Sequence, residues 1–256
     1  MLPLRALLFD LDDTLYPECE YVRSGFRAVS QWAAQSMHVP KKATFEALCQ
    51  LFESGARKDT FDQWLKSIAR DGSEWLPRLL DVYHNHAPRI SPFSEVPGVL
   101  GNLSREMSLG LVSDGVLATQ EKKLDALGLR RYFDCVVFAD AWGRSFWKPC
   151  TRAFEEALRR LEVAASATAY VADNPLKDFS GARQLGIATV RVRRAAGLYS
   201  DREPESPEGR PDAEIASLLD LERCLAEMTA SVSREEREGA PGEVPERSSA
   251  EDSQCR

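Results

Sequence analysis

Short runs of apolar residues alternate with helical patterns over most of this chain, and that alternation leaves few folds open. The apolar runs occupy residues 4–9, 109–112, 136–138, 169–172 and 188–192, and helical patterns cover 116–127, 152–161 and 179–185. Uninterrupted apolar runs of this length suit strands that are buried on both faces of a parallel sheet. Gly128 and Gly186 stand where two of the helices should end. The pattern predicts an α/β domain built on a doubly wound parallel sheet.

One long stretch breaks the alternation directly after the first apolar run. Four amphipathic segments follow one another at 20–36, 42–53, 60–69 and 76–84, with no strand pattern between them. We therefore expect a separate helical insertion, residues 18–90, in an α/β core formed by residues 1–17 and 91–228.

The end of the chain has a different composition. Residues 233–256 carry many charges together with Pro, Gly and Ser and have almost no apolar side chains. Such a segment cannot bury enough surface to offset its ordering entropy, so we predict a disordered tail. Residues 200–211 have a loop composition, and we expect a last short helix to start near residue 212.

Composition excludes several classes of function. The net charge of −7 argues against a nucleic-acid-binding domain, and no apolar run approaches the roughly 20 residues that span a bilayer. Arg5 and Asp10 fall where a signal peptide would be apolar. The six cysteines lie far apart without a CxxC pair, which favours reduced thiols over disulfides or zinc. We expect a cytoplasmic protein without a membrane or nucleic-acid partner; the oligomeric state cannot be read from these residues.

An acidic pair follows the first apolar run. Asp10 and Asp12 are separated by one residue, and alternate residues of an extended chain face the same way. We therefore expect both to project beyond the carboxyl end of the strand, which is where open α/β sheets bind ligands. Two carboxylates this close repel each other unless a cation or a shared proton intervenes, and a set of oxygen ligands suits Mg²⁺.

Three more strand ends carry polar groups. Ser113 follows the second run and precedes a small-residue turn, which could present backbone N–H groups to an anion. Lys148 precedes a helix, and Asp173 and Asp178 follow the fourth run. Taken singly, each has an ordinary alternative, as a helix cap for Ser113 and Asp173 or a solvated lysine for Lys148.

Taken together and in this order, the four motifs resemble those of phosphohydrolases of the haloacid dehalogenase superfamily. The resemblance covers roughly residues 4–222. Within the superfamily, the chain is similar to the branch that includes phosphoglycolate phosphatases, N-acylneuraminate-9-phosphatases and nucleotidases. It implies a Rossmann-like core with a helical cap inserted after the first motif. The matching positions are Asp10-Leu11-Asp12-Asp13-Thr14, Ser113, Lys148, and Asp173 with Asp178.

The resemblance also implies roles for the acids and for the lysine. Asp10 would be the nucleophile that becomes an aspartyl phosphate, and Asp12 the general acid and base. Lys148 would neutralise charge on the nucleophile and the phosphoryl oxygens. Mg²⁺ would be held by Asp10, the backbone carbonyl of Asp12 and Asp173, with Asp178 in support.

The remaining motif residues would bind the phosphoryl group or shape the site. Ser113 would hydrogen-bond the phosphoryl group, and Thr14 would help to fix the turn of the first motif beside the substrate. Asp114 and Gly115 would contact the substrate through their backbone, because a carboxylate facing a phosphate would repel it.

These roles predict a Mg²⁺-dependent phosphatase that acts on a small phosphorylated metabolite, such as a sugar phosphate, a phosphoglycolate-like acid or a nucleoside monophosphate. The aspartate at position 12 favours phosphate esters, because the metal-independent dehalogenase branch lacks it. A phosphomutase using the same aspartyl phosphate remains open, and so does a binding module that has kept the fold without activity.

Overall fold

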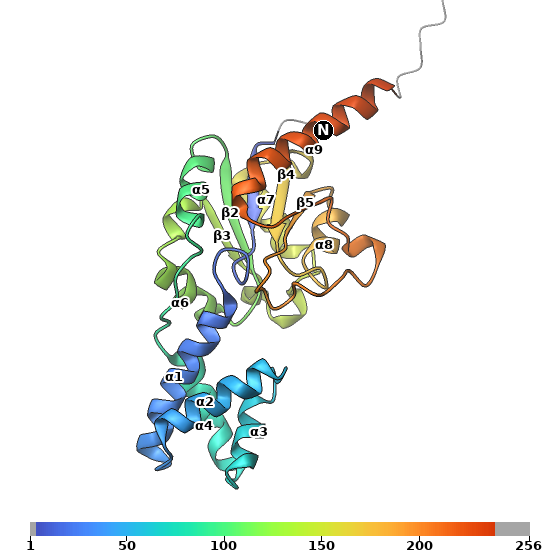
Figure 1. Ribbon diagram of the computed structural model, residues 1–256. Helices are drawn as coiled ribbons and strands as arrows, with labels where there is room; N and C mark the ends of the chain where they lie inside the picture. Colours follow the sequence, from blue (N-terminus) through green and yellow to red (C-terminus); the bar gives the residue numbers. More distant parts are fainter. Residues whose placement is uncertain (1–3, 239–256) are drawn as a thin grey trace, which may run out of the picture.

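The computed structural model describes residues 4–238, and its centre is a six-stranded parallel sheet in the order β3-β2-β1-β4-β5-β6 (Figure 1). The strands are β1 (Ala6–Phe9), β2 (Ser108–Ser113), β3 (Cys135–Phe138), β4 (Thr168–Ala172), β5 (Ala188–Val192) and β6 (Ala213–Ile215). The chain leaves β1 for β2 on one side and later adds β4 on the other. The strand order therefore reverses at β1, and open sheets bind their ligands at the carboxyl side of such a point.

Helices cover both faces of the sheet, which explains why the strand sequences are apolar without interruption. Leu7 and Phe9 of β1 pack on one face, whereas Leu8 packs on the other. The first face is covered by α5 (Val96–Leu103), α6 (Leu117–Leu127) and α9 (Leu221–Glu238), and the second by α7 (Arg152–Leu161) and α8 (Phe179–Gln184). This arrangement confirms the predicted doubly wound α/β fold.

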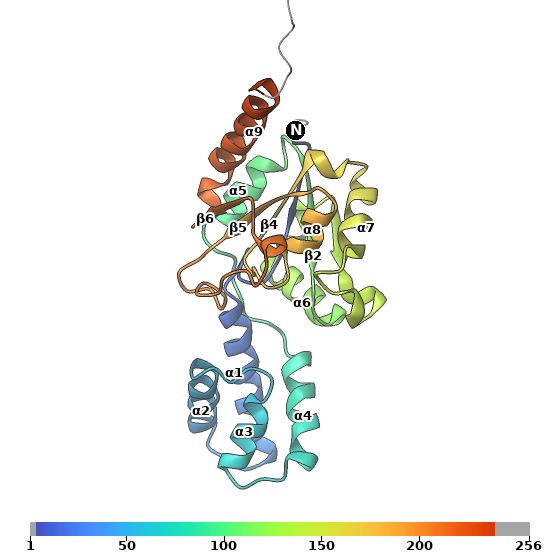
Figure 2. The same ribbon diagram turned by 90° about the vertical axis from the view of Figure 1, so that its right-hand side faces the viewer.

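The helical insertion is also confirmed. Its helices are α1 (Glu18–Ser36), α2 (Lys41–Glu53), α3 (Thr60–Ser67) and α4 (Gly72–Asn85), and they pack together as a separate body beyond the carboxyl end of β1 (Figure 2). The insertion has its own apolar core, in which Trp64, Leu48 and Leu79 are buried. The two connections to the sheet domain lie side by side, because the Phe93 N–H donates to the Leu15 carbonyl at 3.0 Å.

Short 3₁₀ turns complete the connections. They are η1 (Arg130–Tyr132), η2 (Ala139–Trp142), η3 (Arg144–Phe146), η4 (Ala165–Ala167), η5 (Pro207–Gly209) and η6 (Leu218–Asp220).

The carboxyl-terminal part of the fold differs from the prediction. The prediction of a helix starting near residue 212 is wrong, because residues 213–215 form the edge strand β6 beside β5. Ile215 of this strand reaches the core. The last helix, α9, begins at Leu221 and continues to Glu238, past residue 233, where the predicted tail begins. Residues 239–256 of that tail lie outside the described residues. The eight-residue helix α5 was not predicted, because Pro97, Gly98 and Gly101 interrupt its helical pattern.

Within residues 4–238, no helix combines the length and the apolar character needed to cross a bilayer.

Candidate active site

A cavity of about 340 Å³ opens at the carboxyl ends of β1, β2 and β4, between the sheet and the helical insertion. The sheet side contributes Asp10, Asp12, Asp114 and Asp173 to its lining. The insertion contributes Glu18, Tyr21, Tyr83 and His84. The structure therefore brings the acidic residues of three predicted motifs together around one cavity.

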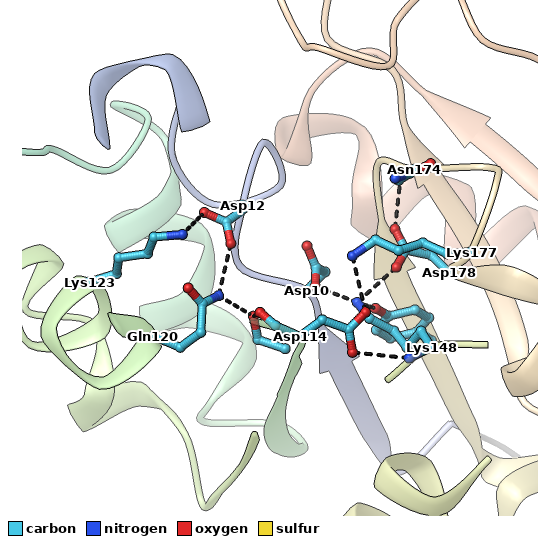
Figure 3. Close-up of polar contacts among 11 residues, drawn as sticks. Asp10, Asp12, Asp114, Gln120, Lys123, Lys148, Asn174, Lys177 and Asp178 are labelled. Carbon is cyan, nitrogen blue, oxygen red and sulfur yellow. Dashed lines mark hydrogen bonds and ion pairs between the residues drawn. The ribbon is translucent and has the colours of Figure 1, made fainter. Parts of the chain in front are cut away.

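Lys148 joins the first and last motifs beneath this cavity. Its Nζ atom lies 2.5 Å from Oδ1 of Asp10 and 2.7 Å from Oδ1 of Asp178, and it donates to the Tyr170 hydroxyl at 2.8 Å (Figure 3). Burial alone would lower the pKa of the Lys148 ammonium, but the two carboxylates outweigh it and raise that pKa well above its ordinary value. Lys148 is thus a permanent cation against the predicted nucleophile.

The Asp10 carboxyl is buried, and burial raises its pKa to about 6 even though Lys148 lowers it in part. Asp178 adds to the rise by repulsion. Asp10 and Asp178 share the single ammonium group of Lys148, so one negative charge is left without a partner when both are ionised. A second cation near Asp10 would balance that charge.

Three carboxylates form a cluster that fits such a cation. One carboxylate oxygen each from Asp10, Asp173 and Asp178 lies within 4.8 Å of the others. Burial, and after it repulsion from Asp178 and Asp10, raises the pKa of Asp173 well above its ordinary value. Among residues 4–238, no hydrogen-bond donor contacts the Asp173 carboxylate, so it is available as a ligand. Carboxylate oxygens are ligands that suit Mg²⁺, and the Asp173 carboxylate beside Asp10 and Asp178 fits this ion.

Asp12 lines the same cavity as Asp10, at the carboxyl end of β1, but its carboxylate has different partners (Figure 3). Its carboxylate accepts from Lys123 Nζ at 2.7 Å, from Gln120 Nε2 at 2.8 Å and from the Tyr16 hydroxyl. Burial would raise the pKa of Asp12, but Lys123 and the hydrogen bonds outweigh it and lower that pKa.

The second motif ends β2. Ser113 is buried, and its Oγ accepts from Gln120 Nε2 at 2.7 Å. The Asp114 carboxylate accepts the Lys148 backbone N–H at 3.1 Å and pairs with Lys177 Nζ at 3.1 Å. It is thus neutralised beside the cavity. Gly115 also lines the cavity and has φ +109°, in the left-handed range that favours glycine.

Thr14 does not line the cavity, and it makes no hydrogen bond to the other predicted site residues within residues 4–238. It is fully buried, it is not among the lining residues, and its backbone carbonyl accepts from Arg194 at 3.2 Å. Among the described residues its Oγ1 atom has no hydrogen-bond partner, so a role of the Thr14 side chain in fixing the turn stays a prediction.

Several residues of the site were missed from the sequence. Lys177 pairs with Asp114, and Gln120 and Lys123 hold Asp12. The available signal was spacing: Gln120 and Lys123 are three residues apart on the helix that follows Ser113, so both reach the same side of it. Glu18 was missed too; burial, and then repulsion from Asp12, raises its pKa to about 7.

The sequence matches that of known proteins over most of its length. The sequence pattern of the family described as haloacid dehalogenase-like hydrolase matches residues 7–192. Glyceraldehyde 3-phosphate phosphatase from Methanopyrus kandleri is 35% identical over 87% of this chain and 99% of its own. Phosphoserine phosphatase from Thermus thermophilus is 33% identical over 85% of this chain and 98% of its own.

A solved structure agrees with these matches. The 2-haloacid dehalogenase from Pseudomonas syringae pv. Tomato DC3000 is 26% identical, with a TM-score of 0.60 over 88% of this chain and 99% of its own. The family expected from the four motifs is thereby confirmed, and with it the fold. The chain belongs to the haloacid dehalogenase-like hydrolases.

Proposed function

We propose that this protein is a Mg²⁺-dependent phosphatase that hydrolyses a small phosphorylated sugar metabolite through an aspartyl phosphate on Asp10. Its broader class is a phosphatase of the haloacid dehalogenase type, a phosphoric monoester hydrolase. The observation that carries the finer proposal is the position of Lys148, which holds Asp10 and Asp178 at the edge of the acidic cluster with Asp173.

The first half of the reaction transfers the phosphoryl group to Asp10. A carboxylate oxygen of Asp10 forms a bond to phosphorus while the bond from phosphorus to the ester oxygen breaks. The leaving oxygen takes a proton from the Asp12 carboxyl group, so the alcohol departs neutral. Lys148 and the hydroxyl of Ser113 stabilise the charge on the phosphoryl oxygens.

The second half returns Asp10 to its free state. The Asp12 carboxylate takes a proton from water, whose oxygen attacks phosphorus and breaks the bond to Asp10. The products are inorganic phosphate and the Asp10 carboxylate. Mg²⁺, held by Asp10, Asp173, Asp178 and the backbone carbonyl of Asp12, would neutralise charge on the phosphoryl group and orient it against the nucleophile.

The proposed substrate class rests on the size of the cavity and on the relatives. A cavity of about 340 Å³ suits a small ester, and part of its wall comes from Tyr21, Tyr83 and His84 of the helical insertion. Residues 18–90 would then act as a cap that excludes bulk water. The two relatives are named for glyceraldehyde 3-phosphate and phosphoserine, and we propose a metabolite of similar size. A cytoplasmic location is part of this proposal.

The test is a screen of phosphorylated metabolites with and without Mg²⁺, in which released inorganic phosphate and consumed ester are both measured. We expect release in equal amount to ester consumed, dependence on Mg²⁺, and loss of activity in Asp10→Asn. Asp62→Asn, an exposed aspartate of the insertion, is the matched control and should keep full activity. Conversion to an isomeric phosphate without release would indicate a mutase, and activity that survives in Asp10→Asn would contradict the proposed nucleophile.

A further inference from the structure

Two buried polar side chains of α6 connect the first and second motifs. Gln120 Nε2 lies 2.8 Å from Oδ2 of Asp12 and 2.7 Å from Oγ of Ser113. One helical turn further on, Lys123 Nζ lies 2.7 Å from Oδ1 of Asp12 (Figure 3). Gln120 and Lys123 are 1% and 5% exposed, so neither is a solvated helix residue that meets Asp12 by chance.

We propose that Gln120 and Lys123 are positioning residues for the reaction. Gln120 fixes the direction in which the Ser113 hydroxyl donates, and Lys123 together with Gln120 holds the Asp12 carboxylate at the edge of the cavity. This inference rests on the proposed function, because it assigns Ser113 to the phosphoryl group and Asp12 to proton transfer.

The direction of the Ser113 hydrogen bond follows from the chemistry of its neighbours. The amide nitrogen of Gln120 faces Asp12 and donates one of its two hydrogens to Oδ2 of that carboxylate. The same nitrogen contacts Ser113, and its second hydrogen is donated to Oγ. Ser113 must therefore be the acceptor in that contact.

An accepting hydroxyl keeps its single hydrogen for another partner. Within residues 4–238, the acceptor that Ser113 Oγ reaches is the backbone carbonyl of Asp114, at 3.4 Å, which is a long contact. A phosphoryl oxygen bound at the carboxyl end of β2 would be a better acceptor, because it carries negative charge. Gln120 thus prepares Ser113 as a donor to the phosphoryl group.

The backbone beside Gln120 is shaped to leave room for it. Gly115 has φ +109°, and a Cβ atom at this position would lie 3.2 Å from Cδ of Gln120. A side chain there would be strained and would push Gln120 from its place between Asp12 and Ser113. The glycine of the second motif therefore serves the position of Gln120 as well as the turn.

Lys123 extends the connection to the helical insertion. Its ammonium lies 4.4 Å from the ring centre of Tyr21 in α1, on the same cavity wall. The cation thus contacts the carboxylate of Asp12 and an aromatic face of the insertion at once, which keeps it in one place without exposure to water.

A double-mutant cycle tests the role of Gln120. Gln120→Leu removes both donated hydrogen bonds at similar size, and Ser113→Ala removes the hydroxyl. Binding of inorganic phosphate in the presence of Mg²⁺ is measured by calorimetry for the wild type, the two single variants and the double variant. If Gln120 acts through Ser113, Gln120→Leu should weaken phosphate binding about five- to tenfold in the wild type and less than about twofold beside Ser113→Ala. Equal weakening in both backgrounds would overturn the proposal.

The role of Lys123 has its own readout. Lys123→Met should slow turnover of an alkyl phosphate at least about tenfold more than it slows the release of p-nitrophenol in the first turnover, because an alkoxide needs the proton of Asp12 and p-nitrophenolate does not. Lys123→Arg should restore part of the difference. Lys66→Met, which makes the same charge change at an exposed lysine of α3, is the matched control and should behave as the wild type. An equal loss on both substrates would overturn the role of Lys123.

Failure of the proposed function can be separated from failure of this inference. A wild type that binds phosphate and shows the coupling between Gln120 and Ser113, but hydrolyses no ester, would contradict the function and support the positioning role. A wild type that hydrolyses the ester, combined with additive effects of Gln120→Leu and Ser113→Ala on phosphate binding, would support the function and contradict the positioning role of Gln120. Circular dichroism of each variant confirms folding, and Lys123→Gln replaces Lys123→Met if the latter does not fold.

Discussion

Lys177 Nζ lies 3.1 Å from Oδ2 of Asp114, and this pair balances the charge of a carboxylate next to the carboxyl end of β2, where we propose that the phosphoryl group binds. The Asp114 side chain is buried, and its other oxygen accepts the backbone N–H of Lys148. An unpaired carboxylate in this position would repel a phosphate ester. Asp114 is therefore compatible with a phosphatase because the fourth motif supplies Lys177.

Removing the lysine should expose that repulsion. We expect Lys177→Met to lower kcat/KM about ten- to a hundredfold, mainly through KM, because the phosphate then faces an uncompensated negative charge. Asp114→Asn introduced into Lys177→Met should restore most of the loss, since the asparagine oxygen can still accept from the backbone of Lys148. Steady-state kinetics of the wild type and the two variants measures this. If the double variant is as impaired as Lys177→Met, the lysine acts on the substrate directly instead of through Asp114.

Asp10→Asn should abolish turnover and leave folding intact. Asparagine has nearly the shape of aspartate but cannot form the acyl phosphate. The buried Asp10 carboxyl has a pKa of about 6, so its charged form is disfavoured in the fold and the neutral amide should not lower the melting temperature in metal-free buffer. Differential scanning calorimetry and a phosphate-release assay check the two parts. A fall of the melting temperature by more than a few degrees would show that the ion pair with Lys148 outweighs the burial.

The effect of Mg²⁺ on stability should depend on pH. In the metal-free protein, burial raises the pKa of Asp10 to about 6 and that of Asp173 well above its ordinary value. In the window between about pH 4 and these raised pKa values, the two carboxyl groups therefore hold more protons in the folded state than in the unfolded chain. Since the folded state binds more protons, the free energy of unfolding should fall as the pH rises through this window. Mg²⁺ needs the ionised carboxylates, so it should stabilise more at pH values above this window than within it.

At about pH 7.5 and a Mg²⁺ concentration about a hundredfold above its dissociation constant, we expect the melting temperature to rise by about 5–10 °C. At about pH 5 the rise should be clearly smaller. Asp173→Asn, which removes one ligand with little change of shape, should lose most of the rise at both pH values. Equal rises at both pH values, or an unchanged rise in Asp173→Asn, would place the ion elsewhere. Thermal denaturation followed by circular dichroism measures the melting temperatures of the wild type and of Asp173→Asn at both pH values.

The sequence was sufficient for the fold and for the motif residues at the strand ends. Buried strands require uninterrupted apolar runs, so β1, β2, β4 and β5 stand out from their surroundings, and polar residues directly after such runs mark the ligand-binding edge. Asp10, Ser113 and Asp173 were predicted in this way, and Lys148 was predicted from its place in the order of the motifs. β6 was not, because a three-residue edge strand with an exposed Glu214 at its centre has no such signal.

The partners of individual side chains were beyond the reach of sequence patterns. After β1 ends at Phe9, the chain bends at Asp13, which has φ +52°. The Asp13 carboxylate holds this bend by accepting from the backbone N–H groups of Glu18 and Leu198, both at 2.8 Å. Leu198 is 185 residues away in sequence, and no local pattern predicts such a contact.

Asp12→Asn should separate the two halves of the reaction. Asp12 is held by Lys123, Gln120 and Tyr16 at the cavity. In the proposed reaction its protonated form gives a proton to the leaving oxygen, and its ionised form later takes one from water. An amide can do neither. The variant should therefore lose alkyl phosphate turnover by about a thousandfold, within the range typical of a removed general acid and base, whereas p-nitrophenyl phosphate should still phosphorylate Asp10.

The expected trace for Asp12→Asn is a burst of p-nitrophenol equal to the enzyme concentration, followed by slow turnover, because water attack on the aspartyl phosphate lacks its base. Stopped-flow absorbance measures the burst, and acid quenching followed by mass spectrometry detects the phosphorylated protein. Asp81→Asn, an exposed aspartate of α4, is the control and should show steady turnover without a burst. If the burst rate and the alkyl phosphate turnover of Asp12→Asn fall by the same factor, Asp12 holds the site together through Lys123 and Gln120 and does not transfer the proton.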